Sequence, residues 1–182
     1  MFLNCLKRRR RVTRDALARR FWDFCGGVSE QFCTDFRVAL VMMGRELSHD
    51  QQIELSREVT IISLWAISNI LRGDRDVLDS LHRMAVSECG NKRERHERGI
   101  EVPVLTQDEL LKRYRQYYAV WDFSSGGPPP FTLASMMLDN MLNQGQASSE
   151  SLDIMLMYLV NAHMLDTMTA VAELRRGFDI VD

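Results

Sequence analysis

The sequence predicts an all-α protein, folded as a single-domain bundle of about six or seven helices with two central apolar helices. Three observations support this fold class. Residues that cap helices recur just before segments with helical apolar periodicity. Two segments, residues 59–71 and 152–171, are apolar on nearly all sides, which is typical of helices surrounded by other helices. No window alternates with period two over a convincing length, so we predict no β-sheet.

The length of 182 residues suits one domain. We divide it into a basic N-terminal arm (residues 1–12), a helical bundle (13–177) and a C-terminal tail (178–182). Residues 1–20 hold eight of the 23 basic residues and one acid, a net charge of +7. The rest, with 15 basic and 24 acidic residues, has a net charge of −9. A basic arm on an acidic body bears on the choice of partner.

The bundle begins with a helix capped by Thr13. We expect this helix to break at Gly26 and Gly27, because each glycine costs about 1 kcal/mol in a helix interior. Ser29 is then placed to cap a second helix. The apolar positions of the two helices are Leu17, Phe21 and Cys25, then Phe32, Phe36, Ala39, Leu40 and Met43.

The next helix opens with a capping box formed by Ser48 and Gln51. It runs to Leu71, and Gly73 is predicted to follow as a left-handed C-cap. The second half of this helix, around Trp65, is the first of the two segments that are apolar on nearly all sides. We therefore predict that it is a central helix.

Two further helices follow along the chain. Asp74 caps the first, which ends at Gly90. Residues 91–105 contain glycine and proline and lack an apolar period, so they are expected to form a loop. Thr106 and Glu109 form a second capping box. Its helix carries one apolar stripe, made of Leu110, Leu111, Tyr114, Tyr118 and Trp121.

The last part of the chain contains two more predicted helices. Residues 124–130 (SSGGPPP) end the preceding helix, since glycine frees the chain and the prolines stiffen it. Thr132 caps a short helix that closes at Gly145. Residues 148–149 begin the final helix, which ends before Gly177. This helix contains the second apolar segment and is predicted to be the second central one.

The sequence contains no convincing motif for catalysis, nucleotide binding or metal binding, so we expect a non-enzymatic protein without a cofactor. His82, Cys89 and His96 are spaced by seven, but this spacing matches no zinc pattern. We instead expect Cys89 in the core and the histidines in solvent. A di-iron site requires two Glu-x-x-His strings, and the sequence has one, at Glu46–His49.

The environment is predicted to be cytoplasmic. The four cysteines have irregular spacings that suit reduced thiols rather than a disulfide framework. The N-terminus lacks the order of charge and apolar residues of an export signal. The longest nearly uncharged apolar run has 13 residues, against roughly 20 for a membrane-spanning helix.

The leading functional hypothesis is an interaction or regulatory protein that binds a protein partner or a second copy of itself. Eleven methionines are a high count, and flexible methionine faces suit helix-binding surfaces. The alternative interpretation is that most of these methionines fill the core. The candidate partner-binding residues are Met136, Met137, Met141, Pro128, Pro129 and Pro130.

A second hypothesis is nucleic-acid binding, because cations contact phosphates and the string RYRQYY (113–118) interleaves cations with aromatic residues. The acidic body argues against it. Contact of residues 1–11 with an anionic membrane surface uses the same cations and has weaker support, because its apolar portion is short. The candidate residues are Lys7, Arg8, Arg9, Arg10, Arg11, Arg113 and Arg115.

A third hypothesis is a small-molecule or enzyme pocket near His163 and Asp166 on the apolar final helix. Asp166 lies three residues after His163, close enough in a helix to orient the imidazole. The alternative, which we favour, is a core or boundary histidine whose ring is satisfied by Asp166 or a backbone carbonyl.

Overall fold

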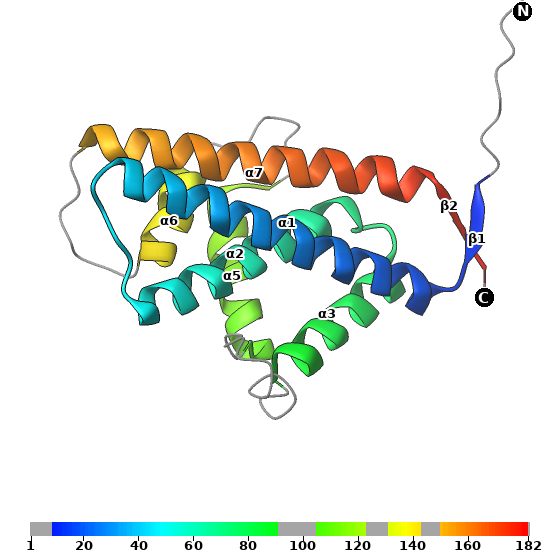
Figure 1. The fold of residues 1–182 in the computed structure, drawn as a ribbon. Helices are drawn as coiled ribbons and strands as arrows, with labels where there is room; N and C mark the ends of the chain where they lie inside the picture. The colour runs from blue at the N-terminus through cyan, green and yellow to red at the C-terminus, as the bar shows by residue number, and fades with distance from the viewer. Residues whose placement is uncertain (1–8, 91–104, 123–130, 143–149, 182) are drawn as a thin grey trace, which may run out of the picture.

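The computed structural model describes residues 9–90, 105–122, 131–142 and 150–181, and it confirms the all-α fold class (Figure 1). Within these residues the chain forms six helices and one pair of three-residue strands. The elements are β1 (Arg10–Val12), α1 (Arg14–Met42), α2 (His49–Ile70), α3 (Arg75–Gly90), α5 (Gln107–Val120), α6 (Phe131–Leu142), α7 (Glu150–Arg176) and β2 (Phe178–Ile180).

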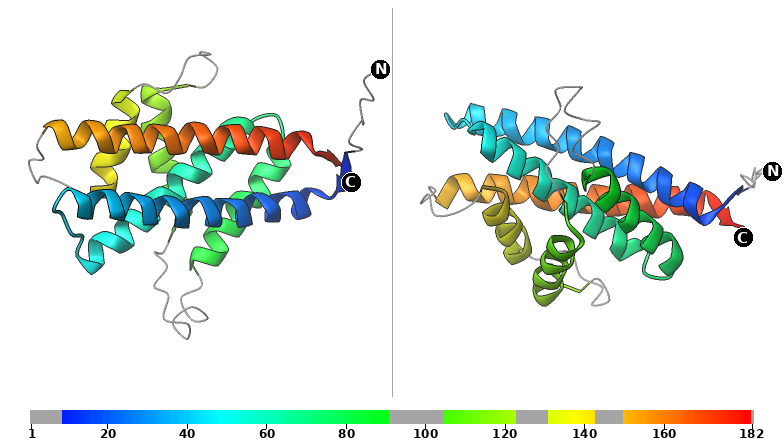
Figure 2. Two further views of the ribbon diagram at one scale, coloured as in Figure 1. Left: turned by 45° about the horizontal axis from the view of Figure 1, so that its top comes forward. Right: turned by 90° about the horizontal axis from the view of Figure 1, so that it is seen from below.

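The helices are arranged around α2. The long helices α1 and α7 run antiparallel, side by side, across one side of the molecule (Figures 1 and 2). The shorter helices α3, α5 and α6 lie on the opposite side. Helix α2 contacts α1, α5, α6 and α7, so it joins the two layers.

The prediction that α2 is a central helix is confirmed. Its nine residues from Ile61 to Asn69 are all buried. Trp65 is fully buried and packs against the rings of Tyr117, Tyr118 and Trp121, at centroid distances of 5.5–5.7 Å. These three rings come from α5 and the residue after it. Tyr118 and Trp121 belong to the apolar stripe predicted there, whereas the buried Tyr117 was not included and Leu111 of the stripe is exposed.

Most of the predicted helix starts are confirmed. The hydroxyl of Thr13 accepts a hydrogen bond from the backbone N–H of Ala16, and both capping boxes are present. Gly73 is not a left-handed C-cap, because Gly44 is the one glycine with a positive φ in the described part of the chain. Helix α6 begins at Phe131, so Thr132 lies inside its first turn rather than before it.

The predicted break at Gly26 and Gly27 is wrong, because α1 is continuous over 29 residues. Ser29 is therefore not a cap but a buried residue inside the helix. The buried face continues through the glycine pair, from Cys25 to Ser29 and Phe32. Packing of this face against α2, α3 and α7 offsets the glycine cost of about 1 kcal/mol per residue.

Replacing Gly26 or Gly27 by alanine should stabilise the protein by about 0.5–1 kcal/mol each. Both glycines are exposed in a helix interior, and an added Cβ would meet nothing within 4 Å. Gly44→Ala is the matched control, and it should destabilise the protein by roughly 1–2 kcal/mol because Gly44 has a φ of 71°. Urea unfolding at one protein concentration measures the free energy of unfolding of all three variants. Loss of stability in both α1 variants would contradict a continuous helix.

The prediction of no sheet is wrong at one place, where β1 of the arm pairs in parallel with β2 of the tail. The register places Arg10 opposite Phe178 and Val12 opposite Ile180. Phe178 is buried, and the guanidinium of Arg20 lies 5.1 Å from the centre of its ring. The described part of the arm is thus joined to the C-terminal tail beside the start of α1.

Candidate functional site

Helix α7 has one buried face and one exposed apolar face. Leu156, Val160, Met164 and Val171 are fully buried against α2 and α6. The opposite face exposes large apolar side chains, so the expectation that other helices cover α7 on all sides is wrong. The exposed members are Ile154, Met155, Tyr158 and Leu165.

The exposed apolar residues at the start of α7 lie near those at the end of α1, because the two helices are antiparallel neighbours (Figure 2). Met42 is 82% exposed and Tyr158 is 58% exposed. Phe131 of α6 adds to this surface, since its ring packs edge-on against that of Tyr158 at 4.9 Å. We define the apolar patch as Val38, Val41, Met42, Phe131, Ile154, Met155 and Tyr158.

Helix α7 is also long and apolar enough to cross a membrane. Its segment Ile154–Arg176 has a mean hydropathy of 1.3 over the most apolar window, and 33% of that window is buried in the protein. Core helices of soluble proteins meet the same criterion, so a single helix of this kind is weak evidence for a membrane span.

A groove of about 350 Å³ lies between α1 and α7, next to the apolar patch. Phe24, Val28 and Phe32 of α1 form one wall, and Leu159 and Ala162 of α7 form the other. His163, Asp166, Gln31 and Asp35 supply most of the polar atoms along the groove. The groove is thus mainly apolar, and its charged residues are both acids.

His163 lies in this groove, but Asp166 does not orient its ring. The Nε2 atom of His163 is 2.9 Å from the hydroxyl of Ser63 on α2, and that hydroxyl accepts a hydrogen bond from Ser29 at 3.0 Å. The ring packs on Phe32, with centroids 4.3 Å apart. Burial lowers the pKa of His163 from 6.5 to about 4, so the imidazole is neutral at pH 7. The expected partner, Asp166, is instead exposed at the rim.

His163 has a second ring nitrogen, Nδ1, besides the one that contacts Ser63. Ser63 is able to donate to Nε2 or to accept from it, because a hydroxyl that accepts from Ser29 keeps a second lone pair and its own hydrogen. Nδ1 carries the ring proton and is a donor in the first case, and it is an acceptor in the second, so its role depends on the tautomer. Among the described residues, no hydrogen bond joins Nδ1 to another protein group.

Two of the three methionines that were predicted to bind a partner are in the core. Met137 and Met141 are fully buried, so they belong to the core and present no atoms to a partner. Met136 is partly buried and packs against the same core. The three prolines, Pro128, Pro129 and Pro130, lie outside the described residues.

The predicted anion-binding residues are dispersed. Lys7 and Arg8 lie outside the described residues, and Arg9 pairs with Asp179 at 3.2 Å. Arg10 and Arg11 are exposed members of β1, and Arg115 is exposed on α5. In the string RYRQYY, Tyr114 and Tyr117 are buried and hence closed to base stacking. Over residues 9–90, 105–122, 131–142 and 150–181, these cations form no continuous basic face with accessible aromatic rings.

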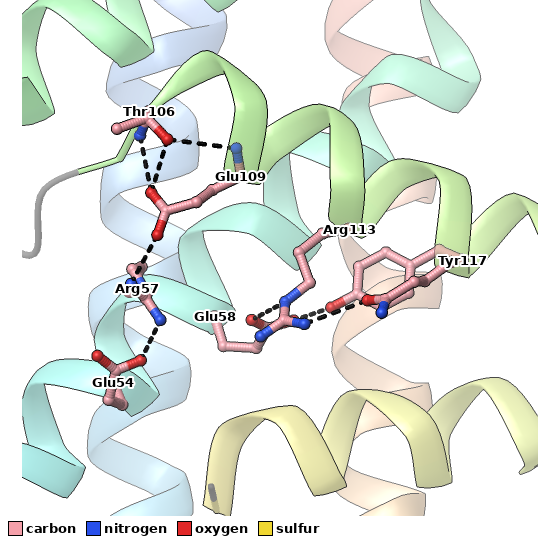
Figure 3. Close-up of polar contacts among 8 residues, drawn as sticks. Glu54, Arg57, Glu58, Thr106, Glu109, Arg113 and Tyr117 are labelled. Carbon is pink, nitrogen blue, oxygen red and sulfur yellow. Dashed lines mark hydrogen bonds and ion pairs between the residues drawn. The ribbon is translucent and has the colours of Figure 1, made fainter.

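Arg113 forms an ion pair with the buried carboxylate of Glu58, which local sequence patterns did not reveal (Figure 3). Its Nε donates a hydrogen bond to Glu58 of α2 at 2.9 Å, and Tyr117 also donates to Glu58. The side chain of Glu58 is 2% exposed. Burial raises the pKa of Glu58 from 4.5 to about 7, although Arg113 opposes this shift. One signal in the sequence pointed to Glu58. It directly precedes segment 59–71, which is apolar on nearly all sides and so has to be covered by other helices.

A second ion-pair group lies beside Glu58 and also joins α2 to α5 (Figure 3). Arg57 contacts Glu109 at 3.1 Å and also pairs with Glu54. Glu109 in turn accepts hydrogen bonds from Thr106, in the capping box of α5. Each charged group drawn in Figure 3 thus has a partner of opposite charge, which gives this region a structural role.

Two of the three residues considered as zinc ligands are described: Cys89 lies in the core and His82 lies at its edge. Cys89 is buried, as expected for a core residue in the last turn of its helix. His82 is half-buried rather than fully solvated, and its Nε2 lies 3.2 Å from both the Ser68 and the Tyr114 hydroxyls. His96 lies outside the described residues. Within the described ranges, no three His, Cys, Asp or Glu side chains form a metal-binding group.

A larger cleft of about 990 Å³ lies between the starts of α1 and α5 and one side of α3. His82 lines it together with several charged side chains. Those side chains bind one another: Ser80 donates to Asp15 at 2.7 Å, and Arg14 lies 3.4 Å from Asp76. The polar groups named here are thus satisfied within the protein, which weakens the argument for a ligand.

Comparisons of the chain with protein-family models, with curated protein sequences and with solved structures found no match. A functional proposal therefore rests on the geometry of the described residues. Their most unusual feature is the exposed apolar surface on α1 and α7.

Proposed function

We propose that this protein is a helical interaction protein that associates with a second copy of itself through the apolar patch. The observation that carries the proposal is the exposure of large apolar side chains on two neighbouring helices. Large contiguous apolar surfaces are rare on monomeric soluble proteins and mark interaction sites. The clearest example of this exposure is the ring pair of Tyr158 and Phe131, because both rings remain exposed although they pack against each other.

The chemistry of the patch favours a second copy as its occupant. None of its seven side chains is charged, so two copies can face each other without like-charge repulsion. A two-fold dimer places the same surface on both sides of the contact. The patch also supplies two aromatic rings and two methionines, residue types that are enriched in the cores of protein interfaces.

Lysine at position 155 or 158 should abolish the self-association. If the protein is a dimer, its melting temperature rises with concentration, by about 3–5 °C for a hundredfold increase in a chain of this size. Met155→Lys and Tyr158→Lys should remove this dependence, because each places an unpaired charge in the contact. Circular dichroism melts at two protein concentrations measure it.

The matched control is Thr169→Lys, which adds the same charge to an exposed position later on α7. This variant should keep the concentration dependence of the wild-type protein. A wild-type melting temperature that does not change with concentration would overturn the proposal, as would equal effects of the patch and control variants.

A further inference from the structure

The groove between α1 and α7 differs from the apolar patch in its charge. Asp35 stands on the α1 side and Asp166 on the α7 side, and none of the side chains that line the groove is a lysine or arginine. Asp23 and Glu30 are also exposed along α1. Two copies of this acidic groove would repel each other, so a second copy of the chain does not suit it.

We propose that this groove binds an amphipathic helix of another protein, with an apolar ridge flanked by lysine or arginine. The apolar ridge matches the walls made by Phe24, Phe32 and Leu159, and the flanking cations match Asp35 and Asp166. Two parallel or antiparallel helices form a trough that accepts a third helix, a common mode of peptide recognition. This proposal does not depend on self-association through the patch.

His163 adds a polar determinant to the groove that it lines. Ser63 and Phe32 hold the ring in place, and no hydrogen bond joins its Nδ1 to another described residue. We expect a partner helix to place a polar side chain opposite this nitrogen, because each ring nitrogen either donates or accepts a hydrogen bond. The imidazole is neutral at pH 7, so it adds no positive charge to the acidic groove.

The test uses the full chain and two synthetic 18-residue helical peptides with the same leucine positions. One peptide carries lysine at its other positions, and the second carries glutamate. Fluorescence anisotropy should show binding of the lysine peptide and at least tenfold weaker binding of the glutamate peptide. Equal affinity for the two peptides would overturn the proposal.

Variants then locate the binding. Ala162→Phe fills the groove from an exposed position and should weaken binding of the lysine peptide about tenfold or more. Ala119→Phe is the control. It makes the same change on the exposed face of α5 and should have no effect on binding. Equal effects of these two variants would place the peptide elsewhere and overturn the proposal.

The rim charges are tested with two double variants that change the net charge by the same amount. Asp35→Asn combined with Asp166→Asn should weaken binding about threefold or more, since exposed ion pairs are individually modest. Asp50→Asn combined with Asp139→Asn removes the same charge at exposed sites outside the groove and should leave the affinity unchanged. If both pairs weaken binding equally, the peptide is held by overall charge and the proposal fails. Tyr158→Lys should retain peptide binding, which separates this proposal from that for the patch.

Discussion

Replacing Arg113 by methionine should destabilise the protein by about 1–2 kcal/mol at pH 8. The buried carboxylate of Glu58 loses its counter-ion and takes up a proton instead, which costs about 1.4 kcal/mol at one pH unit above its pKa of about 7. Arg115→Met, on the exposed side of the same helix, should cost less than about 0.5 kcal/mol. Urea unfolding at a fixed protein concentration measures both variants.

The cost of Arg113→Met should shrink at pH 5. The raised pKa of Glu58, about 7, means that its carboxyl is mostly protonated there, and a neutral carboxyl needs no counter-ion. Glu58→Gln should rescue most of the stability of Arg113→Met at pH 8, because the buried charge is then absent. A cost that is equal at pH 5 and pH 8, or no rescue by glutamine, would contradict the buried ion pair.

The second large effect is a pair of opposing pH dependences. The pKa of His163 is lowered from 6.5 to about 4, so its contribution to stability is present above pH 6.5 and is lost as the pH falls through 4. The pKa of Glu58 is raised from 4.5 to about 7, so its contribution is present below pH 4.5 and is lost as the pH rises through 7. Each shift corresponds to about 3 kcal/mol.

Because the two contributions oppose each other between pH 4.5 and 6.5, single variants should separate them. Relative to the wild-type protein, Glu58→Gln should lose stability as the pH falls from 7 to 4.5, and His163→Gln should gain it. The difference should approach about 3 kcal/mol in each case. Thr169→Gln, at an exposed position of α7 that has no titratable group, is the control and should follow the wild-type curve. Parallel curves for all four proteins would show that neither group is buried as described.

Local signals in the sequence predicted the helices well. Thr13, the capping box of Ser48 and Gln51, and that of Thr106 and Glu109 each act within four residues along the chain, so they are legible without tertiary structure. The central position of α2 was also predictable, because a helix that is apolar on every face has to be covered.

The failures arise where distant contacts override local preference. Packing against three other helices keeps α1 continuous through Gly26 and Gly27. The pairing of β1 with β2 joins residues more than 160 positions apart, and strands of three residues show no alternating pattern. The same apolar composition that predicted a covered α7 leaves one of its faces exposed, since composition cannot show which neighbours are present.

The candidate site was predicted only in part. His163 and Asp166 do line one groove, as their spacing suggested, but the partner of the imidazole is Ser63, which is 100 residues away in the chain. Likewise, Arg113 was chosen for its charge, and the Glu58 carboxylate that occupies it lies on another helix. Pairings between helices are set by the fold and are not encoded in local spacing.

We propose that the apolar patch on α1, α6 and α7 is a contact surface between two copies of the chain. The most direct measurement is the mass of the wild-type protein in detergent-free buffer, by sedimentation equilibrium over a wide range of concentration. We expect the mass to rise from the monomer value of 21.1 kDa to twice that value. A mass that stays at the monomer value at the highest concentration would contradict it.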